Sequence, residues 1–551
     1  MAKKMTRFIL FLCITSALLT ACSNAVNSNN NSAGTGSSGN KATAANEVDP
    51  ANPAFSAYKE PVTIHTVTSE YSSAKYPKGD DITNNVWTRR YKEKFNVEVV
   101  TDWVSDEYDT KLNLAISSND LPDVFRVNAS QLQQLIEADM VMDLSEVFDT
   151  YASERLKGYM EADPDSSESG KKDGKLYGIP QLHWGLIDQP DFVWIRNDWK
   201  EELGIEDPKS VDDIKNIALK FMEKHGGYGI AVDQTLDYLN LLAVAWNAHP
   251  DMWIEDGSGK LVYGSVQPEM KDALAEWAEW YKQGIIDPEF PIKDFSAMNA
   301  DVVAGKVGVQ PYFQWWGYNP GVDTVSNLGK DAIFYPYAIP SVDGGEAKQS
   351  IFFANGNYTV VKKGFKHPEA VFKLLNDYAY IVDEGVGKES KETLSALLDN
   401  DIAHVVGAFR VLNPNSDYEQ FEAVTATLQS KDISDLTTAG MLQKYNNSVK
   451  FMTDATPGAV GDFLQQGAPK SAYGLAKQTL DNQNYIKTAL WGATPEALAS
   501  YGTTLDDILT EGFTKIIMGN ENIDYFDTVI KNWQTAGGDA ATEAVNEAYG
   551  K

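Results

Sequence analysis

VTIHTVTS, residues 62–69, is the first of three strand-like segments whose order decides the fold. VEVVTDWV (97–104) and LPDVFRVN (121–128) follow it and share its richness in β-branched residues. The residues between the segments have helical spacing, as Tyr91 and Phe95 illustrate. Strands that alternate with helices predict a parallel sheet covered by helices, so we expect an α/β fold.

A second alternation begins at FVWIRNDWKEELGI (192–205), and amphipathic helices are predicted at 210–225 and 268–286. The stretch 355–379 predicts a strand, a turn and a helix, and the tail from about residue 470 is mostly helical in pattern. A chain of 551 residues is too long for one core, so we expect two or three lobes. The predicted ranges are 58–185 with about 351–450 for the first lobe, and 186–350 with about 451–551 for the second.

The start of the chain has the features of an export signal. Lys3, Lys4 and Arg7 precede a short apolar run, which ends in Leu19-Thr20-Ala21-Cys22. This order resembles the lipobox of bacterial lipoproteins, which implies a signal peptide at 1–21 and lipidation of Cys22. The alternative is an ordinary secretory peptide with an incidental cysteine. Residues 22–57 are rich in Asn, Ser and Gly, which predicts a flexible tether. We therefore expect a body on the extracytoplasmic face of the cell membrane, held by lipid alone.

The charge of the chain limits its partners. The formal net charge is −31, and only six arginines follow residue 21. Such a field repels nucleic acid, so no nucleic-acid partner is expected. Sites for polyanions usually use arginine, because its guanidinium group binds carboxylates and phosphates through two hydrogen bonds. The shortage of arginine favours a neutral ligand.

Several motifs together resemble one family. They are GKLYGIP (174–180), WIRNDW (194–199), GIIDPEF (284–290), GKVGV (305–309) and EGFTKIIMGNENIDYFDTVIKNW (511–533). In this order, behind a lipobox, the chain resembles the extracellular solute-binding lipoproteins of ABC sugar importers, in the large form similar to alginate-oligosaccharide-binding proteins. The resemblance implies a periplasmic-binding-protein-like fold: two α/β lobes with parallel-rich sheets, a hinge and a helical C-terminal region. It also implies a monomer that holds an oligosaccharide between its lobes and delivers it to ABC permease subunits.

A sugar ring has an apolar face and a rim of hydroxyl groups, so its binding site needs aromatic platforms and planar polar side chains. The segment QPYFQWWGYN (310–319) offers both, after a predicted strand. Alternatives remain: one tryptophan of the pair could be core, Trp184 could wedge the hinge, and Asn355 could be a turn residue. The candidate ligand contacts are Gln314, Trp315, Trp316, Tyr318, Trp184, Trp491, Glu70, Tyr71, Asn128 and Asn355.

Catalytic and metal motifs are weak. Asp287 and Glu289 could imitate a glycosidase pair, but their position before a proline-containing loop favours a turn. No histidine spacing indicates zinc, and no cofactor is expected. The stretch 165–176 has oxygen side chains like those of a calcium loop, but Leu176 stands where an EF-hand has glutamate. The resemblance to uronate-binding relatives leaves a looser calcium loop as the alternative to a solvated loop. A non-enzymatic binder is the main reading. The alternatives are a surface lyase or glycoside hydrolase, or a binder of peptides or another solute.

Overall fold

The computed structural model describes residues 52–70, 76–183, 185–353, 355–384, 388–389, 397 and 409–550. The predicted signal peptide, Cys22, the first part of the tether, Tyr71 and Trp184 lie outside these residues. Within them, no helix is both long enough and apolar enough to cross a bilayer.

The first predicted strands pair as expected. β1 (Val62–Ser69) and β2 (Val97–Ser105) run in parallel, and α1 (Val86–Phe95) connects them. The side chain of Asn85 caps α1 by accepting hydrogen bonds from two backbone N–H groups of its first turn. Residues four apart share one helix face, and α1 buries its aromatic side chains there. These are Trp87, Tyr91 and Phe95.

The neighbouring three-stranded sheet is antiparallel. β13 (Tyr358–Val361) lies between β3 (Val124–Val127) and β6 (Gly178–Pro180) and runs opposite to both. The backbone N–H of Asp123 donates to the carbonyl of His65 at 2.9 Å, which places β1 beside β3. The expectation of parallel-rich sheets is therefore only partly right. β13 belongs to a segment that returns from the second half of the chain and enters the sheet from the opposite end.

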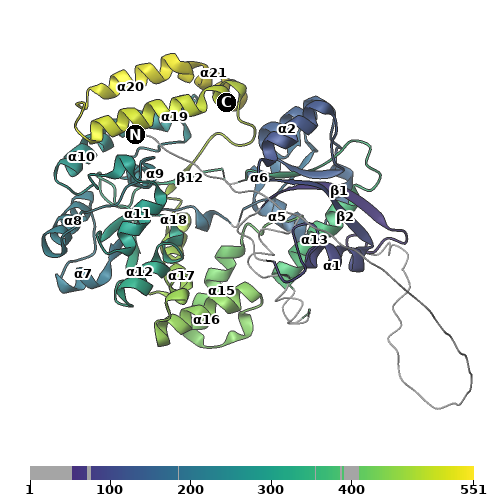
Figure 1. Ribbon diagram of the computed structural model, residues 1–551, viewed down its shortest axis with the longest axis horizontal. Helices are drawn as coiled ribbons and strands as arrows, with labels where there is room; N and C mark the ends of the chain where they lie inside the picture. Colours follow the sequence, from purple (N-terminus) through teal and green to yellow (C-terminus); the bar gives the residue numbers. More distant parts are fainter. Residues whose placement is uncertain are drawn as a thin grey trace, which may run out of the picture. The chain divides into compact units, whose positions relative to one another are not determined.

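Helix α13 (Glu369–Glu384) follows β13 and packs beside α1, although the two are far apart in sequence (Figure 1). Asp377 of α13 is fully buried and accepts hydrogen bonds from Arg90 Nε at 2.6 Å and from Lys94 Nζ at 2.5 Å.

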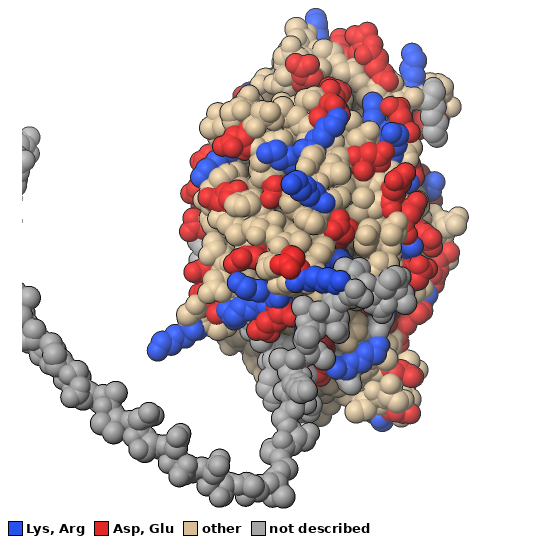
Figure 2. Space-filling model, turned by 90° about the vertical axis from the view of Figure 1, so that its right-hand side faces the viewer, with Lys and Arg blue, Asp and Glu red and all other residues tan. Residues whose placement is uncertain are grey.

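On the molecular surface, Lys and Arg side chains are interspersed with Asp and Glu side chains over the face drawn in Figure 2. The other elements before the first crossing are α2 (Tyr108–Ser118), α3 (Ala129–Glu137), α4 (Ser145–Tyr151), α5 (Glu154–Ala162), α6 (Pro164–Ser169), β4 (Lys171–Lys172) and β5 (Lys175–Leu176).

The second sheet is centred on β7 (Phe192–Arg196). It pairs in antiparallel fashion with β10 (Val309–Tyr312) and β11 (Phe334–Tyr337). The two amphipathic helices expected from the sequence are present as α8 (Val211–His225) and α10 (Pro268–Lys282). Both bury an apolar stripe in the core that lies on one face of this sheet.

The C-terminal region is helical, as predicted. α19 (Glu496–Ile517), α20 (Tyr525–Trp533) and α21 (Asp539–Tyr549) pack together and contribute to the same core as α10 (Figure 1). The remaining elements are η1 (Leu186–Asp188), α7 (Asn197–Glu202), α9 (Asp237–Asn240), η2 (Leu241–Trp246), β8 (Trp253–Glu255), β9 (Leu261–Tyr263), η3 (Gly264–Val266), η4 (Phe290–Ile292), α11 (Phe295–Val303), η5 (Gln314–Gly317), α12 (Gly321–Leu328), β12 (Gln349–Ile351), α15 (Ser416–Ser430), η7 (Ile433–Asp435), α16 (Ala439–Asp454), η8 (Pro457–Ala459), α17 (Val460–Asp462), η9 (Phe463–Gly467), α18 (Ala472–Asp481), β14 (Tyr485–Lys487) and η10 (Gln534–Gly538).

The buried apolar residues separate into two lobes. The first lobe contains the cores built from residues 62–182 and 358–412, and the second contains those built from 187–347 and 421–545. Along β7, Val193 faces one core of the second lobe and Trp194 the other, because side chains alternate across a strand. Both α15 and α16 pack in the second lobe. We therefore propose that the last crossing lies close to residue 413 and not near 450.

Three segments of backbone connect the lobes, and one residue joins all three. The N–H of Gln181 donates to the carbonyl of Asn357 at 2.9 Å, and the carbonyl of Gln181 accepts from the N–H of Leu412 at 2.8 Å. Gly185 follows with φ = +120°, and a Cβ there would lie 2.1 Å from the carbonyl oxygen of Pro414. The crossings thus lie against one another with no room for a side chain at residue 185.

The described N-terminal segment is clasped by α13. Lys373 Nζ donates to the carbonyl of Pro53 at 2.5 Å and to Ser56 Oγ at 3.1 Å. Asn376 Nδ2 donates to the carbonyl of Ala54 at 3.2 Å. Both side chains are almost fully buried, so the chain enters the first lobe at a fixed place.

The crossing geometry predicts that Gly185→Ala is destabilising. Alanine must adopt a positive φ and also displace the backbone at Pro414, and strain of the first kind alone costs about 1–3 kcal/mol. Gly356→Ala, on a neighbouring crossing, is the matched control because its Cβ would meet no atom within 4 Å. Chemical denaturation measures both, and equal stability of the two variants would contradict the crossing geometry.

Candidate functional site

A cavity of about 900 Å³ is lined by residues of both lobes. The first lobe contributes the residues around the start of α6. The second contributes the β8–β9 hairpin, β14 with the loop after it, and the end of α21. All three crossings also contribute, through residues 183, 185–187 and 189, residues 351–353, and residues 414–415. The cavity is therefore built where both lobes and their connections can reach one ligand.

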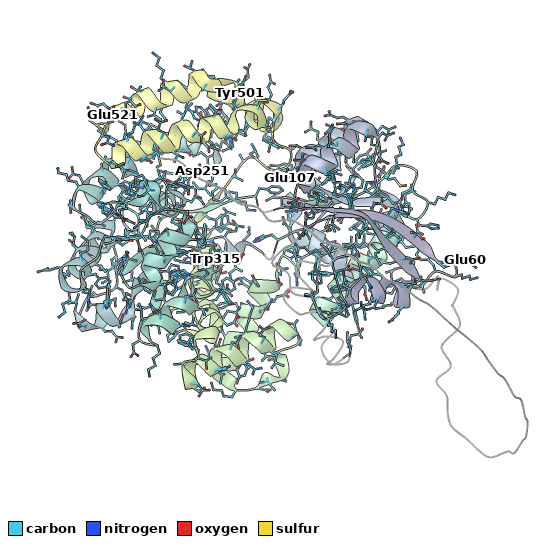
Figure 3. All side chains as sticks on the ribbon, viewed as in Figure 1. Glu60, Glu107, Asp251, Trp315, Tyr501 and Glu521 are labelled. Carbon is cyan, nitrogen blue, oxygen red and sulfur yellow. The ribbon has the colours of Figure 1, made fainter. Side chains whose placement is uncertain are left out.

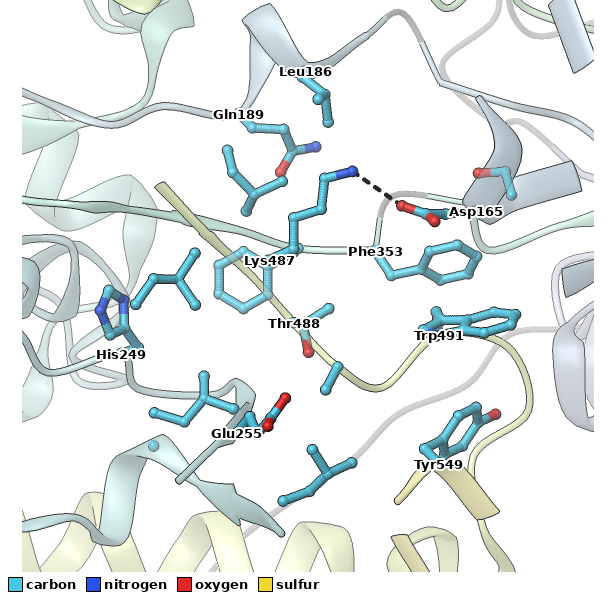
Figure 4. A pocket seen from close by; sticks show the side chains of 18 of the residues that line it. Asp165, Leu186, Gln189, His249, Glu255, Phe353, Lys487, Thr488, Trp491 and Tyr549 are labelled. Carbon is cyan, nitrogen blue, oxygen red and sulfur yellow. Dashed lines mark hydrogen bonds and ion pairs between the residues drawn. The ribbon is translucent and has the colours of Figure 1, made fainter. Parts of the chain in front are cut away.

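Aromatic rings dominate one side of the cavity (Figure 4). Trp491 is 40% exposed and Phe352 is 42% exposed, so both offer ring surface to a ligand. Tyr549 lies 6.1 Å from Trp491 between ring centroids, and its hydroxyl donates to the carbonyl of Ala493 at 2.6 Å. Phe353 is half-buried on the same side. These rings can stack on a flat apolar face.

Polar side chains surround the rings. Lys487 Nζ, on β14, lies 3.0 Å from Asp165 Oδ2, on α6, so this ion pair joins the two lobes across the cavity (Figure 4). Gln189 lies near them and offers an amide. His249 Nδ1 lies 2.9 Å from Ser350 Oγ, and burial lowers the pKa of His249 to about 4. Its imidazole is therefore neutral at pH 7.

The aromatic segment at 310–319 is not in this lining. Trp316 is fully buried and stacks on Trp194 at 5.3 Å, so the prediction that it faces ligand is corrected: it belongs to the core. Trp315 is half-buried and stacks on Phe313 at 5.5 Å between centroids (Figure 3). Every second residue of β10 already faces this core, and the turn of η5 carries the tryptophan pair back into it.

The polar residues of that segment are engaged inside the second lobe. Gln314 donates to Asp188 Oδ1, and its own Oε1 accepts from Gln465 Nε2 at 2.6 Å. The hydroxyl of Tyr318 donates to Asp462 Oδ1 at 2.6 Å. These bonds tie η5 to α17 and η9, so Gln314 and Tyr318 fix the packing of these elements.

Of the other residues predicted to contact ligand, some line the cavity and some do not. Trp491 lines the cavity, whereas Glu70 is exposed and is not among the lining residues. Asn128 caps α3 by accepting from the N–H of Gln131 at 2.9 Å, which gives it a structural role. Asn355 is buried beside the crossing, and its side-chain amide makes no hydrogen bond within the described part of the chain. Tyr71 and Trp184 lie outside the described residues.

Sequence reasoning missed most of the lining. Phe352 and Phe353 stand just before the return crossing that the sequence did indicate, so an aromatic pair at that crossing was an available signal. No signal in the sequence indicated that Lys487 and Tyr549 line the cavity. They reach the cavity only because the C-terminal helices fold back onto the second lobe.

One buried carboxyl group stands out at the crossing. Burial, and then the negative charge of Asp417, raise the pKa of Asp188 to about 7. Asp188 Oδ1 accepts hydrogen bonds from Gln314 and from the hydroxyl of Tyr473, the latter at 3.1 Å. Between about pH 4 and pH 7, Asp188 is therefore protonated in the folded protein and ionised in the unfolded chain.

The described residues that were considered as metal ligands have other places in the fold. The stretch 165–176, considered for calcium, forms part of α6 and the β4–β5 hairpin. Among the described residues, no three His, Cys, Asp or Glu side chains are grouped as metal ligands. Asp287 is buried and accepts from the N–H of Glu289 at 2.9 Å and from Lys293 Nζ at 2.6 Å, so this carboxylate pair closes a turn, as expected.

Comparison with known proteins agrees with this architecture. A family model described as bacterial extracellular solute-binding protein matches residues 66–379. The chain is 23% identical to lipoprotein LipO of Bacillus subtilis (82% of this chain, 86% of the relative). It is 22% identical, with the same coverage, to the polygalacturonan/rhamnogalacturonan-binding protein YtcQ of that organism. The crystal structure of the Streptococcus pneumoniae ABC-transporter substrate binding protein FusA with kestose is similar in fold: TM-score 0.57, 16% identity, 88% of this chain and 98% of that one.

The raised pKa of Asp188 predicts a pH-dependent stability. Between pH 4 and 7 the folded state binds more protons than the unfolded state, so stability falls as pH rises through this window. Asp188→Asn keeps a side-chain oxygen as acceptor and removes the charge. It should be more stable than wild type at pH 8, by up to about 4 kcal/mol, and similar at pH 4.

Denaturation at both pH values measures this difference. Asp331→Asn, at an exposed position of the same lobe, is the control and should change neither value. An Asp188→Asn variant with an unchanged pH profile would show that this carboxyl group is already ionised in the folded protein.

Proposed function

The chain belongs to the bacterial extracellular solute-binding proteins, and from this membership we propose that it captures an oligosaccharide in the cavity lined by Trp491 and delivers it to an ABC permease. The observation that carries the proposal is the combination of exposed rings and polar side chains, contributed by both lobes, around one cavity. The similarity to YtcQ, a polygalacturonan/rhamnogalacturonan-binding protein, and to FusA, an ABC-transporter substrate binding protein in complex with kestose, supports it.

The chemistry of the lining suits a sugar. Trp491 and Phe352 offer flat apolar faces for the C–H side of a pyranose or furanose ring. Gln189, Thr488 and Asn415 offer amide and hydroxyl groups to its rim. A sugar with the wrong hydroxyl arrangement leaves such groups unpaired, at a cost of about 1–3 kcal/mol each.

The proposed mechanism is closure around the ligand. The crossings at Gln181, Asn357 and Leu412 let the lobes move as bodies, and a ligand that contacts both lobes favours the closed arrangement. The ion pair between Asp165 and Lys487 adds a direct link of the same kind. The permease would then recognise the closed form of a monomer.

We also propose that the protein acts without chemistry on its ligand. The family is one of binding proteins, as are YtcQ and FusA, and the carboxylate pair at Asp287 and Glu289 is engaged in a turn. The proposal includes no calcium and no cofactor. Its outer parts are a lipid on Cys22, a tether at 22–57 and residence on the extracytoplasmic face of the cell membrane.

Trp491→Ala tests the cavity as the sugar site. Loss of the platform should weaken the tightest oligosaccharide by about 2 kcal/mol, roughly 30-fold, as measured by calorimetry. Tyr501→Ala is the control, because Tyr501 is similarly exposed (41%) and is not among the cavity residues. If gluco-, galacto-, manno-, xylo-, fructo- and uronate oligosaccharides all fail to bind the wild type, the proposed function is wrong.

Cys22→Ala tests the anchor. In cells grown with labelled palmitate, the wild type should carry label and stay with the membranes, whereas the variant should carry none. Cys13→Ala is matched to it, because Cys13 lies in the segment that would be removed and its loss should leave labelling intact. Equal labelling of wild type and Cys22→Ala would place the lipid elsewhere.

A further inference from the structure

The ionisable groups of the cavity are unevenly matched. Its lining contains five carboxylates and, among the described lining residues, a single Lys or Arg, Lys487. His249 also lines it but is neutral at pH 7, as described above. The carboxylates are Asp163, Asp165, Glu255, Asp256 and Glu269.

The one cation is already paired. Lys487 Nζ lies 3.0 Å from Asp165 Oδ2, so a carboxylate on a ligand would have to compete with Asp165 for it. A guanidinium group, which binds carboxylates through two parallel hydrogen bonds, is absent from the described lining. The cavity therefore has no ready partner for a ligand that carries negative charge.

The carboxylates come from different elements. Asp163 and Asp165 stand at the start of α6, Glu255 and Asp256 at the β8–β9 hairpin, and Glu269 in the first turn of α10. A ligand inside a cavity of about 900 Å³ lies within a Debye length, about 8 Å at physiological salt, of some of them wherever it sits. A net charge of −31 over the whole chain adds to the same repulsion.

The same groups suit an uncharged sugar. A carboxylate accepts hydrogen bonds, and every hydroxyl of a neutral sugar can donate one. The feature that repels a uronate therefore binds a neutral ring, and the exposed faces of Trp491 and Phe352 are indifferent to that charge.

We infer that this cavity selects uncharged oligosaccharides over those that contain uronic acids. The inference rests on the proposed function and defines its substrate class. It assigns the selection to the carboxylates at the rim, above all Glu255 and Asp256, which are exposed on the β8–β9 hairpin.

Calorimetry with matched pairs tests the inference on the mature chain. The probes are oligogalacturonides, oligomannuronides and oligoglucuronides, each as the free acid and as the methyl ester, beside neutral gluco-, galacto-, manno-, xylo- and fructo-oligosaccharides. The tightest ligand should be uncharged, and any free acid that binds should be at least tenfold weaker than its ester. This gap should shrink at high salt, because screening weakens the repulsion.

A charge variant locates the effect. Glu255→Gln combined with Asp256→Asn should strengthen the binding of free acids and narrow the gap to the esters. The pair Glu521→Gln and Asp524→Asn, on the same lobe and away from the cavity, is the control and should leave the gap unchanged.

Three results would overturn the inference: a free acid as the tightest ligand, an acid that binds as tightly as its ester, or a gap that widens with salt. Binding of no glycan at all would overturn the proposed function itself. That outcome is distinct, because the inference fails alone only when some glycan binds.

Discussion

The structure depends on the two backbone hydrogen bonds of Gln181. Its N–H and its carbonyl are both satisfied by other crossings, one by Asn357 and one by Leu412. Buried backbone groups must find partners, so the first crossing cannot leave this position without exposing unpaired groups on the other two. The lobes on either side are folded around their own cores, and they are joined by this short bundle of extended backbone and by the ion pair between Asp165 and Lys487. The cavity is placed by the same arrangement, since all three crossings continue directly into its lining.

The sequence predicted the elements well where local pattern decides them. The spacing of Trp87, Tyr91 and Phe95 is enough to define α1, and the alternation of strand and helix gives the α/β class. Strand direction was less accessible, because β13 pairs with β3 although the two strands are more than 200 residues apart in sequence, and no local signal records the orientation of β13. The sequence also gives little information about the last crossing, which we propose to lie close to residue 413. α15 and α16 are amphipathic in either lobe, and only tertiary contacts assign them to the second.

The site was predicted least well, and the physical reason is visible in the segment 310–319. A run of aromatic and amide side chains is equally suited to a sugar and to a core that contains buried hydrogen bonds. Here Trp316 stacks on Trp194, and Gln314 forms hydrogen bonds with Asp188 and Gln465. The segment therefore packs into the core. The cavity instead takes its aromatic surface from residues that are isolated in sequence, such as Trp491 and Tyr549. Composition indicated a chain rich in platforms, and the fold determined which of them stay uncovered.

The clasp of the N-terminal segment by Lys373 and Asn376 has a mechanical consequence. Force or constraint applied through the leading part of the chain is delivered to α13, in the first lobe, and not to the crossings. If the molecule is held at its N-terminal end, as proposed, the first lobe stays in place and the second lobe is the part that moves. In the proposed closure, the second lobe can therefore move without displacing the segment that α13 holds.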